Sequence, residues 1–298
     1  HYSVDWRFGD SIMRGVLTAI LTGFVLCASP AALPASTAWA ATDLASAYND
    51  NTDAAFRIGL QTRLAWTGDY AGAFDGKVGA QTLRAIRDFQ ARNGFTADGV
   101  MTEDFLKKVI ASSDVSRDRV GFHFISDERT GVRVGVPSNL VSAAGETEVG
   151  SIWRSDDSGV EIETVRFHDE GYTLQGVYDV LSANGETKTV SSSNMAGDAF
   201  TIRGEEDGRS FLIRFSGRGS DLRGFSVAWD AQHEADIASY TVVAANTFAP
   251  FSGQPRSEEL GPMAKLFQSG RAEGVAFDDH SSGDMDAPKS GPSMSSPG

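Results

Sequence analysis

The spacing between apolar residues changes near residue 117. Before that point apolar residues recur every three or four positions, as in Leu60 and Leu64, which is the spacing of one face of a helix. After it they alternate with polar or small residues, as in Phe122 and Phe124, which is typical of a strand with one buried face. The sequence therefore predicts an α+β protein of two units. The expected units are a small all-α three-helix module over residues 52–111 (the helical module) and a separate β-rich α+β sandwich domain over residues 117–250 (the β-rich domain).

The helical module is expected to hold three helices. The first follows Thr52 or Asp53, either of which can serve as an N-cap. The second is expected to run from about Ala80 to Asn93, and the third begins after an N-cap at Thr102. Residues 112–118 are polar and are expected to form a short linker to the β-rich domain.

A set of turn and helix residues occurs in a fixed order within the helical module. The set is Asp75, Gly76, Gly79, Thr82, Phe89, Gln90, Gly94, Asp98 and Gly99. It resembles the peptidoglycan-binding module of bacterial cell-wall hydrolases. We expect most of these residues to build the scaffold. Glycines suit positive φ, the aspartates suit turns in which they accept hydrogen bonds from backbone amides, and Phe89 belongs in the core.

The resemblance implies that the module grips wall peptide or glycan in a shallow groove. Aromatic rings would lie against sugar, and cations would face peptide carboxylates. The candidate contacts are Tyr70, Phe74, Lys77, Arg84 and Arg87. Each cation has an alternative role on a solvated helix face, and Phe74 has one in the core. The implied partner is peptidoglycan.

The first forty residues have the pattern of a secretory signal peptide. Met13 and Arg14 precede an uncharged apolar run from Gly15 to Ala28, which is too short for a comfortable membrane span. Residues 1–12 are taken as sequence upstream of the signal. The predicted cleavage site is formed by Ala38, Ala40 and Ala41. We expect export to the periplasm or the extracellular space, with no stable membrane insertion after cleavage; an uncleaved anchor or a buried helix is the alternative.

Charge and cysteine content exclude several classes of protein. The net charge is −14, so the chain is a poor binder of nucleic acid. The helical module has eight basic and seven acidic residues, whereas residues 112–298 have 16 and 29, which favours the module as the wall-facing part. The single cysteine, Cys27, precedes the predicted cleavage site. The mature chain therefore has no thiol for catalysis or for a disulfide.

The β-rich domain is expected to hold a meander of strands with two helices. Its predicted strands include Ser151–Arg154 and Val160–Phe167, and its two helices are centred near Val177 and Tyr240. The order of elements is weakly similar to the sandwich of PsbP-like photosystem subunits. That resemblance depends on Val134–Pro137 and on an aromatic-Pro ending at Asn246–Pro250.

No catalytic or cofactor motif is visible in the sequence. HExxH, GxSxG and Walker patterns are missing. His168 with its two acidic neighbours is expected to be an exposed turn, His123 to face solvent, and Gly217–Asp221 to be a turn. We therefore expect no metal, no cofactor and no enzyme activity. A pair of carboxylates that cleaves glycan remains an alternative, because the sequence does not show which acidic residues lie close together in the fold.

The C-terminal residues 251–298 are rich in Ser, Gly and Pro and are expected to form a disordered tail. Together these observations predict an exported cell-envelope protein that binds peptidoglycan without cleaving it. The β-rich domain is expected to contact another envelope component. Two alternatives stay open: a module that has kept only its fold and binds protein, and an accessory domain of a wall-acting hydrolase.

Overall fold

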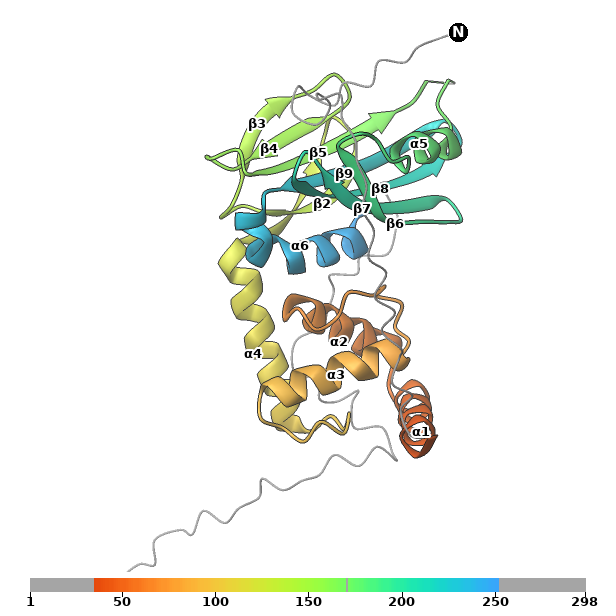
Figure 1. Cartoon of the computed structure of the whole chain (residues 1–298), viewed down its shortest axis with the longest axis vertical. Helices are drawn as coiled ribbons and strands as arrows, with labels where there is room; N and C mark the ends of the chain where they lie inside the picture. The colour runs from red at the N-terminus through yellow and green to blue at the C-terminus, as the bar shows by residue number, and fades with distance from the viewer. Residues whose placement is uncertain (1–34, 170, 252–298) are drawn as a thin grey trace, which may run out of the picture.

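The computed structural model of the chain describes residues 35–169 and 171–251, with side chains from Asp43 onward. Its helices are α1 (Ala35–Asn51), α2 (Ala54–Trp66), α3 (Ala80–Arg92), α4 (Glu103–Val120), α5 (Leu174–Leu181) and α6 (Glu234–Thr247), with a short 3₁₀ helix η1 (Ala231–His233) before α6. Its strands are β1 (Phe122–Asp127), β2 (Val132–Pro137), β3 (Ser142–Glu146), β4 (Ser151–Arg154), β5 (Val160–Phe167), β6 (Lys188–Ala196), β7 (Ala199–Glu206), β8 (Arg209–Arg218) and β9 (Asp221–Trp229). The predicted order, a helical unit followed by a sheet-rich unit, is confirmed (Figure 1).

The three predicted helices of the helical module are present as α2, α3 and α4. The carboxylate of Asp53 accepts a hydrogen bond from the Phe56 amide at 2.7 Å, which caps α2. The hydroxyl of Thr102 accepts one from the Phe105 amide at 3.1 Å, which caps α4. The buried core of the module includes Leu60, Leu64, Leu83, Ile86, Phe89 and Phe105. Local spacing therefore predicted both these helices and their buried faces.

Helix α1 adds an element that the sequence did not predict. Tyr48, near its end, is completely buried. The Tyr48 hydroxyl donates to the carbonyl of Gly99 at 2.9 Å and accepts from the amide of Met101 at 2.9 Å. Burial raises the pKa of Tyr48 to about 12. The second half of α1 is therefore part of the core of the helical module.

Helix α4 corrects the expected linker at residues 112–118, because those residues lie inside the helix. Asp114 forms an ion pair with Arg63 of α2 at 2.6 Å, and the buried Ser113 accepts a hydrogen bond from the same guanidinium at 2.7 Å. These contacts outweigh the modest helix propensity of serine and aspartate. Gly121, at φ +64°, then ends the helix. The chain thus runs as one helix from the helical module to the first strand (Figure 1).

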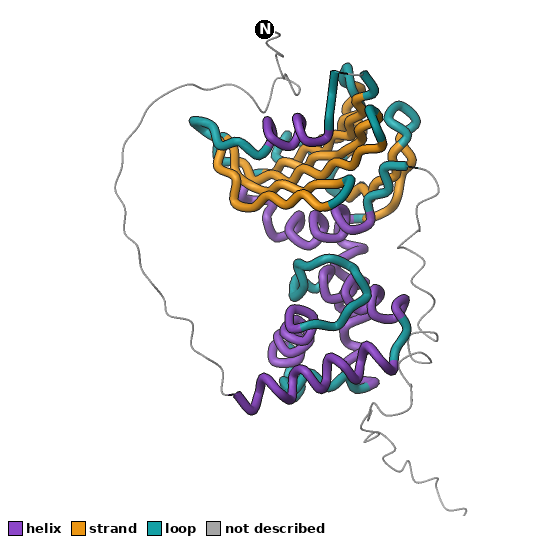
Figure 2. Tube along the Cα trace, turned by 90° about the vertical axis from the view of Figure 1, so that its right-hand side faces the viewer, coloured by secondary structure: helices purple, strands orange, loops and turns teal. Residues whose placement is uncertain are grey.

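Seven strands form one antiparallel sheet in the order β3-β4-β5-β9-β8-β7-β6, and β1 pairs with β2 in a hairpin. Helix α6 and the hairpin pack on one face of the sheet, on Ile162, Leu212 and Phe225 among others. Helix α5 packs on the other face, which holds Phe200 and Phe215. Figure 2 shows a helix on each side of the strands. The residues of β5, β8 and β9 therefore alternate between two apolar layers.

The strands predicted at Ser151–Arg154 and Val160–Phe167 are present as β4 and β5 with the same bounds. The predicted helices of this unit are α5 and α6. Strand β3 was missed, because its sequence has no large apolar residue and every position is exposed. His123 and His168 are exposed, as predicted, and Gly219 at φ +65° lies in the turn between β8 and β9.

The helical module and the β-rich domain share a packed interface. Ala65 and Trp66, at the end of α2, belong to the same apolar cluster as α6. The Trp66 ring meets the Phe122 ring edge-on at 5.0 Å. The side chain of Asn246 accepts a hydrogen bond from the Phe74 amide at 3.0 Å. The two units are therefore joined by side-chain packing as well as by α4.

Predictions for the two ends of the chain fall outside the described residues or at their margin. The apolar run Gly15–Ala28 and the tail from Ser252 are not described. Ala38, Ala40 and Ala41 lie in the first half of α1, where side chains are not described, so cleavage stays a prediction. Within the described ranges, no helix has the length and apolar character to cross a membrane.

Candidate functional site

Gln61 holds the first Asp-Gly turn of the helical module. Its side-chain nitrogen donates to the Asp75 carboxylate at 2.9 Å and to the Lys77 carbonyl at 3.1 Å, and its oxygen accepts from the Gly76 amide at 3.0 Å. Gly76 has φ +68°, so a residue with a Cβ would be strained there. Burial opposes ionisation of Asp75, yet the hydrogen bonds from Gln61 and the Lys77 amide hold its pKa below the usual value.

Gln90 holds the second Asp-Gly turn in the same manner. Its nitrogen donates to the Val100 carbonyl at 2.8 Å, and its oxygen accepts from the Gly99 amide at 2.9 Å. Asp98 accepts from the Val100 amide at 2.8 Å, and Gly99 has φ +87°. Each turn is thus locked by one buried glutamine that satisfies polar groups on both of its sides. Both aspartates accept a hydrogen bond from a backbone amide of their turn, and Gly76 and Gly99 have positive φ, as a scaffold role requires.

An arginine side chain donates hydrogen bonds to a backbone carbonyl of each of these turns. Arg57 donates to the carbonyl of Gly76 and to that of Asn49. Arg87 donates to the Asp98 carbonyl through two nitrogens, at 3.3 Å each. Arg87 was predicted as a ligand contact; its guanidinium is partly exposed and lies against this turn. Arg57 and Gln61 were missed, although a lone glutamine on the apolar stripe of α2 was a visible signal.

The other predicted ligand residues have different surroundings. Tyr70 is 5% exposed, and its hydroxyl donates to the Ala73 carbonyl at 2.7 Å, so its ring serves the core rather than an open stacking surface. Phe74 is half-buried between the two units. Lys77 and Arg84 are exposed, and Arg84 only approaches Asp88, at 3.9 Å. The structure thus leaves Lys77 and Arg84 as the candidates open to a ligand.

The remaining predicted motif residues are structural. Phe89 is buried, as expected. Thr82 is 2% exposed, and its hydroxyl donates to the Lys77 carbonyl at 3.3 Å. Gly79 is the N-cap of α3, and Gly94 has φ +79° just after its end.

A pocket of about 580 Å³ lies between the two units, walled by α2, α4, β1 and α6. Trp66, Phe122 and Phe124 line its apolar side. Its charged side chains pair with one another, since Arg63 meets Asp114 at 2.6 Å and Arg117 meets Asp118 at 3.0 Å. The pocket is thus an interface cleft that combines an apolar wall with paired charges.

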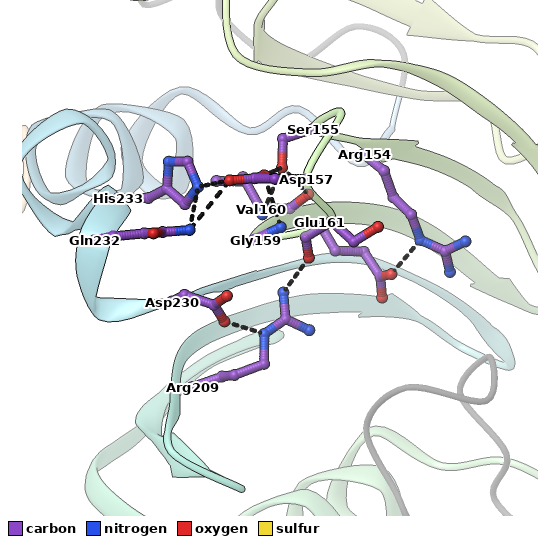
Figure 3. Close-up of polar contacts among 11 residues, drawn as sticks. Arg154, Ser155, Asp157, Gly159, Val160, Glu161, Arg209, Asp230, Gln232 and His233 are labelled. Atoms are coloured by element: carbon purple, nitrogen blue, oxygen red, sulfur yellow. Dashed lines mark hydrogen bonds and ion pairs between the residues drawn. The ribbon is translucent and has the colours of Figure 1, made fainter.

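Ser155, Asp157 and His233 form a hydrogen-bonded trio beside the turn between β4 and β5 (Figure 3). The Ser155 hydroxyl donates to Asp157 at 2.6 Å, and the His233 Nε2 lies 2.9 Å from the other carboxylate oxygen. A hydrolase triad has the imidazole between the nucleophile and the carboxylate, whereas here the carboxylate stands in the middle. Hydrogen bonds from Ser155, Gly159 and His233 lower the pKa of Asp157. The trio therefore stabilises the turn and anchors η1, and it does not activate the serine.

Two glutamates on β5 are one neighbouring pair of carboxylates in the β-rich domain. Glu161 and Glu163 point to the same side of the sheet, and they are 5% and 2% exposed. Arg154 donates to Glu161 at 2.6 Å (Figure 3). Burial raises the pKa of Glu163 to about 7. Both carboxyl groups are too deeply buried for a glycan chain to reach them. Among the described side chains, no group of three could hold a metal ion.

The helical module matches a known protein family. Residues 55–109 match the family model of a putative peptidoglycan binding domain. The matched segment holds α3, most of α2 and both of the turns locked by Gln61 and Gln90. No curated protein matches the chain.

The chain is also similar to a solved structure, the solution structure of cyanobacterial PsbP (CyanoP) from Synechocystis sp. PCC 6803. The identity is 13% and the TM-score is 0.33. The match covers 43% of this chain and 92% of that chain.

Proposed function

We propose that this protein is exported to the bacterial cell envelope and binds peptidoglycan through its helical module without cleaving it. The observation that carries the proposal is the match over residues 55–109 combined with a complete scaffold, in which both Asp-Gly turns are locked by buried glutamines. Export is inferred from the signal pattern before Ala41. The β-rich domain is proposed to contact another envelope component.

The proposed contact surface contains Lys77 and Arg84. Both side chains are exposed, and Arg84 is 83% exposed, so their charges are available to peptide carboxylates of the wall. Two exposed contacts worth about 0.7 kcal/mol each correspond to roughly tenfold tighter binding. The near-neutral charge of the helical module also lowers repulsion from an anionic polymer.

The test is sedimentation of the mature chain, from Ala41 onward, with purified sacculi. The double variant K77E/R84E is expected to bind about tenfold more weakly. The control is K107E/K108E, which makes the same charge change on the exposed side of α4. Equal binding by all three proteins would contradict the proposed surface, and no binding by the wild type would contradict the function. Soluble muropeptides released from the sacculi would contradict the non-catalytic part.

A second candidate function is supported by two of the predicted contact residues. Tyr70 is buried and Phe74 lies against α6, so neither offers an open ring to sugar. These positions favour a module that keeps the fold and binds a protein partner. Retained partner binding in a wild-type chain that does not sediment with sacculi would select this candidate.

A further inference from the structure

Two arginines of the β-rich domain lie half-buried on the sheet face that α6 packs against. Arg203 on β7 and Arg214 on β8 are close neighbours, because Thr201 pairs directly with Arg214 and Arg203 is two residues further along the strand. The side chain of Arg214 reaches Thr201 on this face, at 2.8 Å. Arg203 reaches Thr241 of α6 at 3.4 Å. Two positive charges therefore stand side by side at the edge of α6.

Neither guanidinium has an acidic partner within ion-pair distance among the residues that the structure describes. Each carries five N–H donors, and within the same residues each makes one hydrogen bond, to a threonine hydroxyl. The Nε of Arg214 is buried without a partner. The carboxylates that influence the two arginines, Glu234 and Asp198, act only from a distance.

An anion would complete this arrangement favourably, because both cations are partly withdrawn from water. A buried cation is costly to leave unpaired, and burial lowers the pKa of both guanidinium groups. Arg166 and Arg223 on this face differ, since they share Asp221 at 2.9 Å and 2.8 Å. The two arginines also lie in the acidic part of the chain, since residues 112–298 include 16 basic and 29 acidic residues.

The part of the sheet face that carries Arg203 lies outside the apolar cluster under α6. The apolar cluster under α6 takes residues from β5, β8 and β9 and none from β6 or β7. In the neighbouring edge strand, Ser192 and Asn194 pair with Arg203 and Thr201, and both are exposed. Their hydroxyl and amide groups lie on the same face as the arginines.

We propose that Arg203 and Arg214, flanked by Ser192 and Asn194, form a binding site for an oxyanion, the carboxylate or phosphate group of a small ligand. Guanidinium groups match the planar or tetrahedral oxygens of both. The site lies on the β-rich domain and is independent of the proposed wall contact through Lys77 and Arg84.

The test measures thermal unfolding of the full mature chain in chloride buffer, with added inorganic phosphate and, in a second arm, with added triglutamate peptide. Ligand at ten times its Kd is expected to lower the unfolding equilibrium constant of the wild type about tenfold. The variant R203M/R214M keeps the side-chain length without the charge and is expected to lose this effect. The control R119M/R129M, two exposed arginines outside both proposed binding surfaces, is expected to keep it.

Stabilisation by phosphate alone identifies a phosphate ligand, and stabilisation by the peptide identifies a carboxylate; either supports the site. The absence of both effects in the wild type, or equal effects in R203M/R214M, would overturn it. If that variant does not fold, the wild type still decides, because Arg Nε signals of Arg203 and Arg214 should shift in NMR titration. Sacculus binding by R203M/R214M is expected to be unchanged, which separates this proposal from the proposed function.

Discussion

The buried carboxyl group of Glu163 allows a test of how ionisation within the sheet changes the free energy of unfolding. It lies in the middle of β5, opposite Ile152 on one side and Ser226 on the other. The side chain is 2% exposed, and its Oε1 has no hydrogen-bond partner in the described structure. Burial raises its pKa from 4.5 to about 7. Replacement by glutamine keeps the shape and removes the charge.

The size of the effect follows from the two pKa values. Their difference is about 2.5, and each step of one is worth 1.36 kcal/mol, which gives about 3 kcal/mol. Because the folded-state pKa of Glu163 is raised, its favourable contribution is complete below pH 4.5 and is lost as the pH rises through about 7. The wild type is therefore expected to lose about 3 kcal/mol relative to E163Q between pH 4 and pH 8.

Urea unfolding of both proteins at several pH values measures this difference directly. The control is E128Q, because Glu128 is exposed and its replacement should leave the pH dependence as in the wild type. A free-energy difference between E163Q and the wild type that is the same at pH 4 and pH 8 would refute the reasoning. It would mean that Glu163 is solvated or paired in solution.

Three further substitutions test other contacts by the free energy of unfolding. Q61L removes the side chain that locks the first Asp-Gly turn and is expected to cost about 2 kcal/mol, whereas Q81L, on the exposed side of α3, should cost little. W66A empties the interface between the two units and is expected to cost about 3 kcal/mol. G121A puts a Cβ at φ +64°, 2.7 Å from the Asn139 side chain, and is expected to cost about 2 kcal/mol.

Each of these predictions has a clear contrary result. A Q61L protein as stable as Q81L would show that water satisfies the turn. A W66A protein as stable as the wild type would show that the two units do not pack in solution. An unaffected G121A would mean that α4 does not end in the left-handed conformation.

The features that the sequence predicted are those that depend on neighbours in the chain. The caps at Asp53 and Thr102, the apolar stripe of α2 and the positive-φ glycines are set by residues within one or two turns. The alternation that marks β5 is local in the same sense. These elements form in the structure where the sequence places them.

The features that it did not predict depend on contacts over long distances in the chain. The helix over residues 112–118 needs Arg63, about 50 residues away. The burial of Tyr70 needs the folded core of the module, and Phe74 meets Asn246 from the far end of the chain. The pairing of Thr201 with Arg214 becomes visible only when the sheet is formed. The spacing of residues in the sequence therefore could not predict which candidate ligand residues are exposed.

The unbroken helix α4 has a mechanical consequence. Its 18 residues span about 27 Å at 1.5 Å per residue, and it enters the β-rich domain directly at β1. A partner that binds the helical module therefore also determines the distance and the orientation of the sheet relative to that partner. One residue inserted into α4 would rotate the sheet by about 100° about the helix axis and shift it by about 1.5 Å along that axis. This change would also disrupt the packing of α2 against α6. The length of α4 and the packing of α2 against α6 therefore together set the distance between the helical module and the sheet.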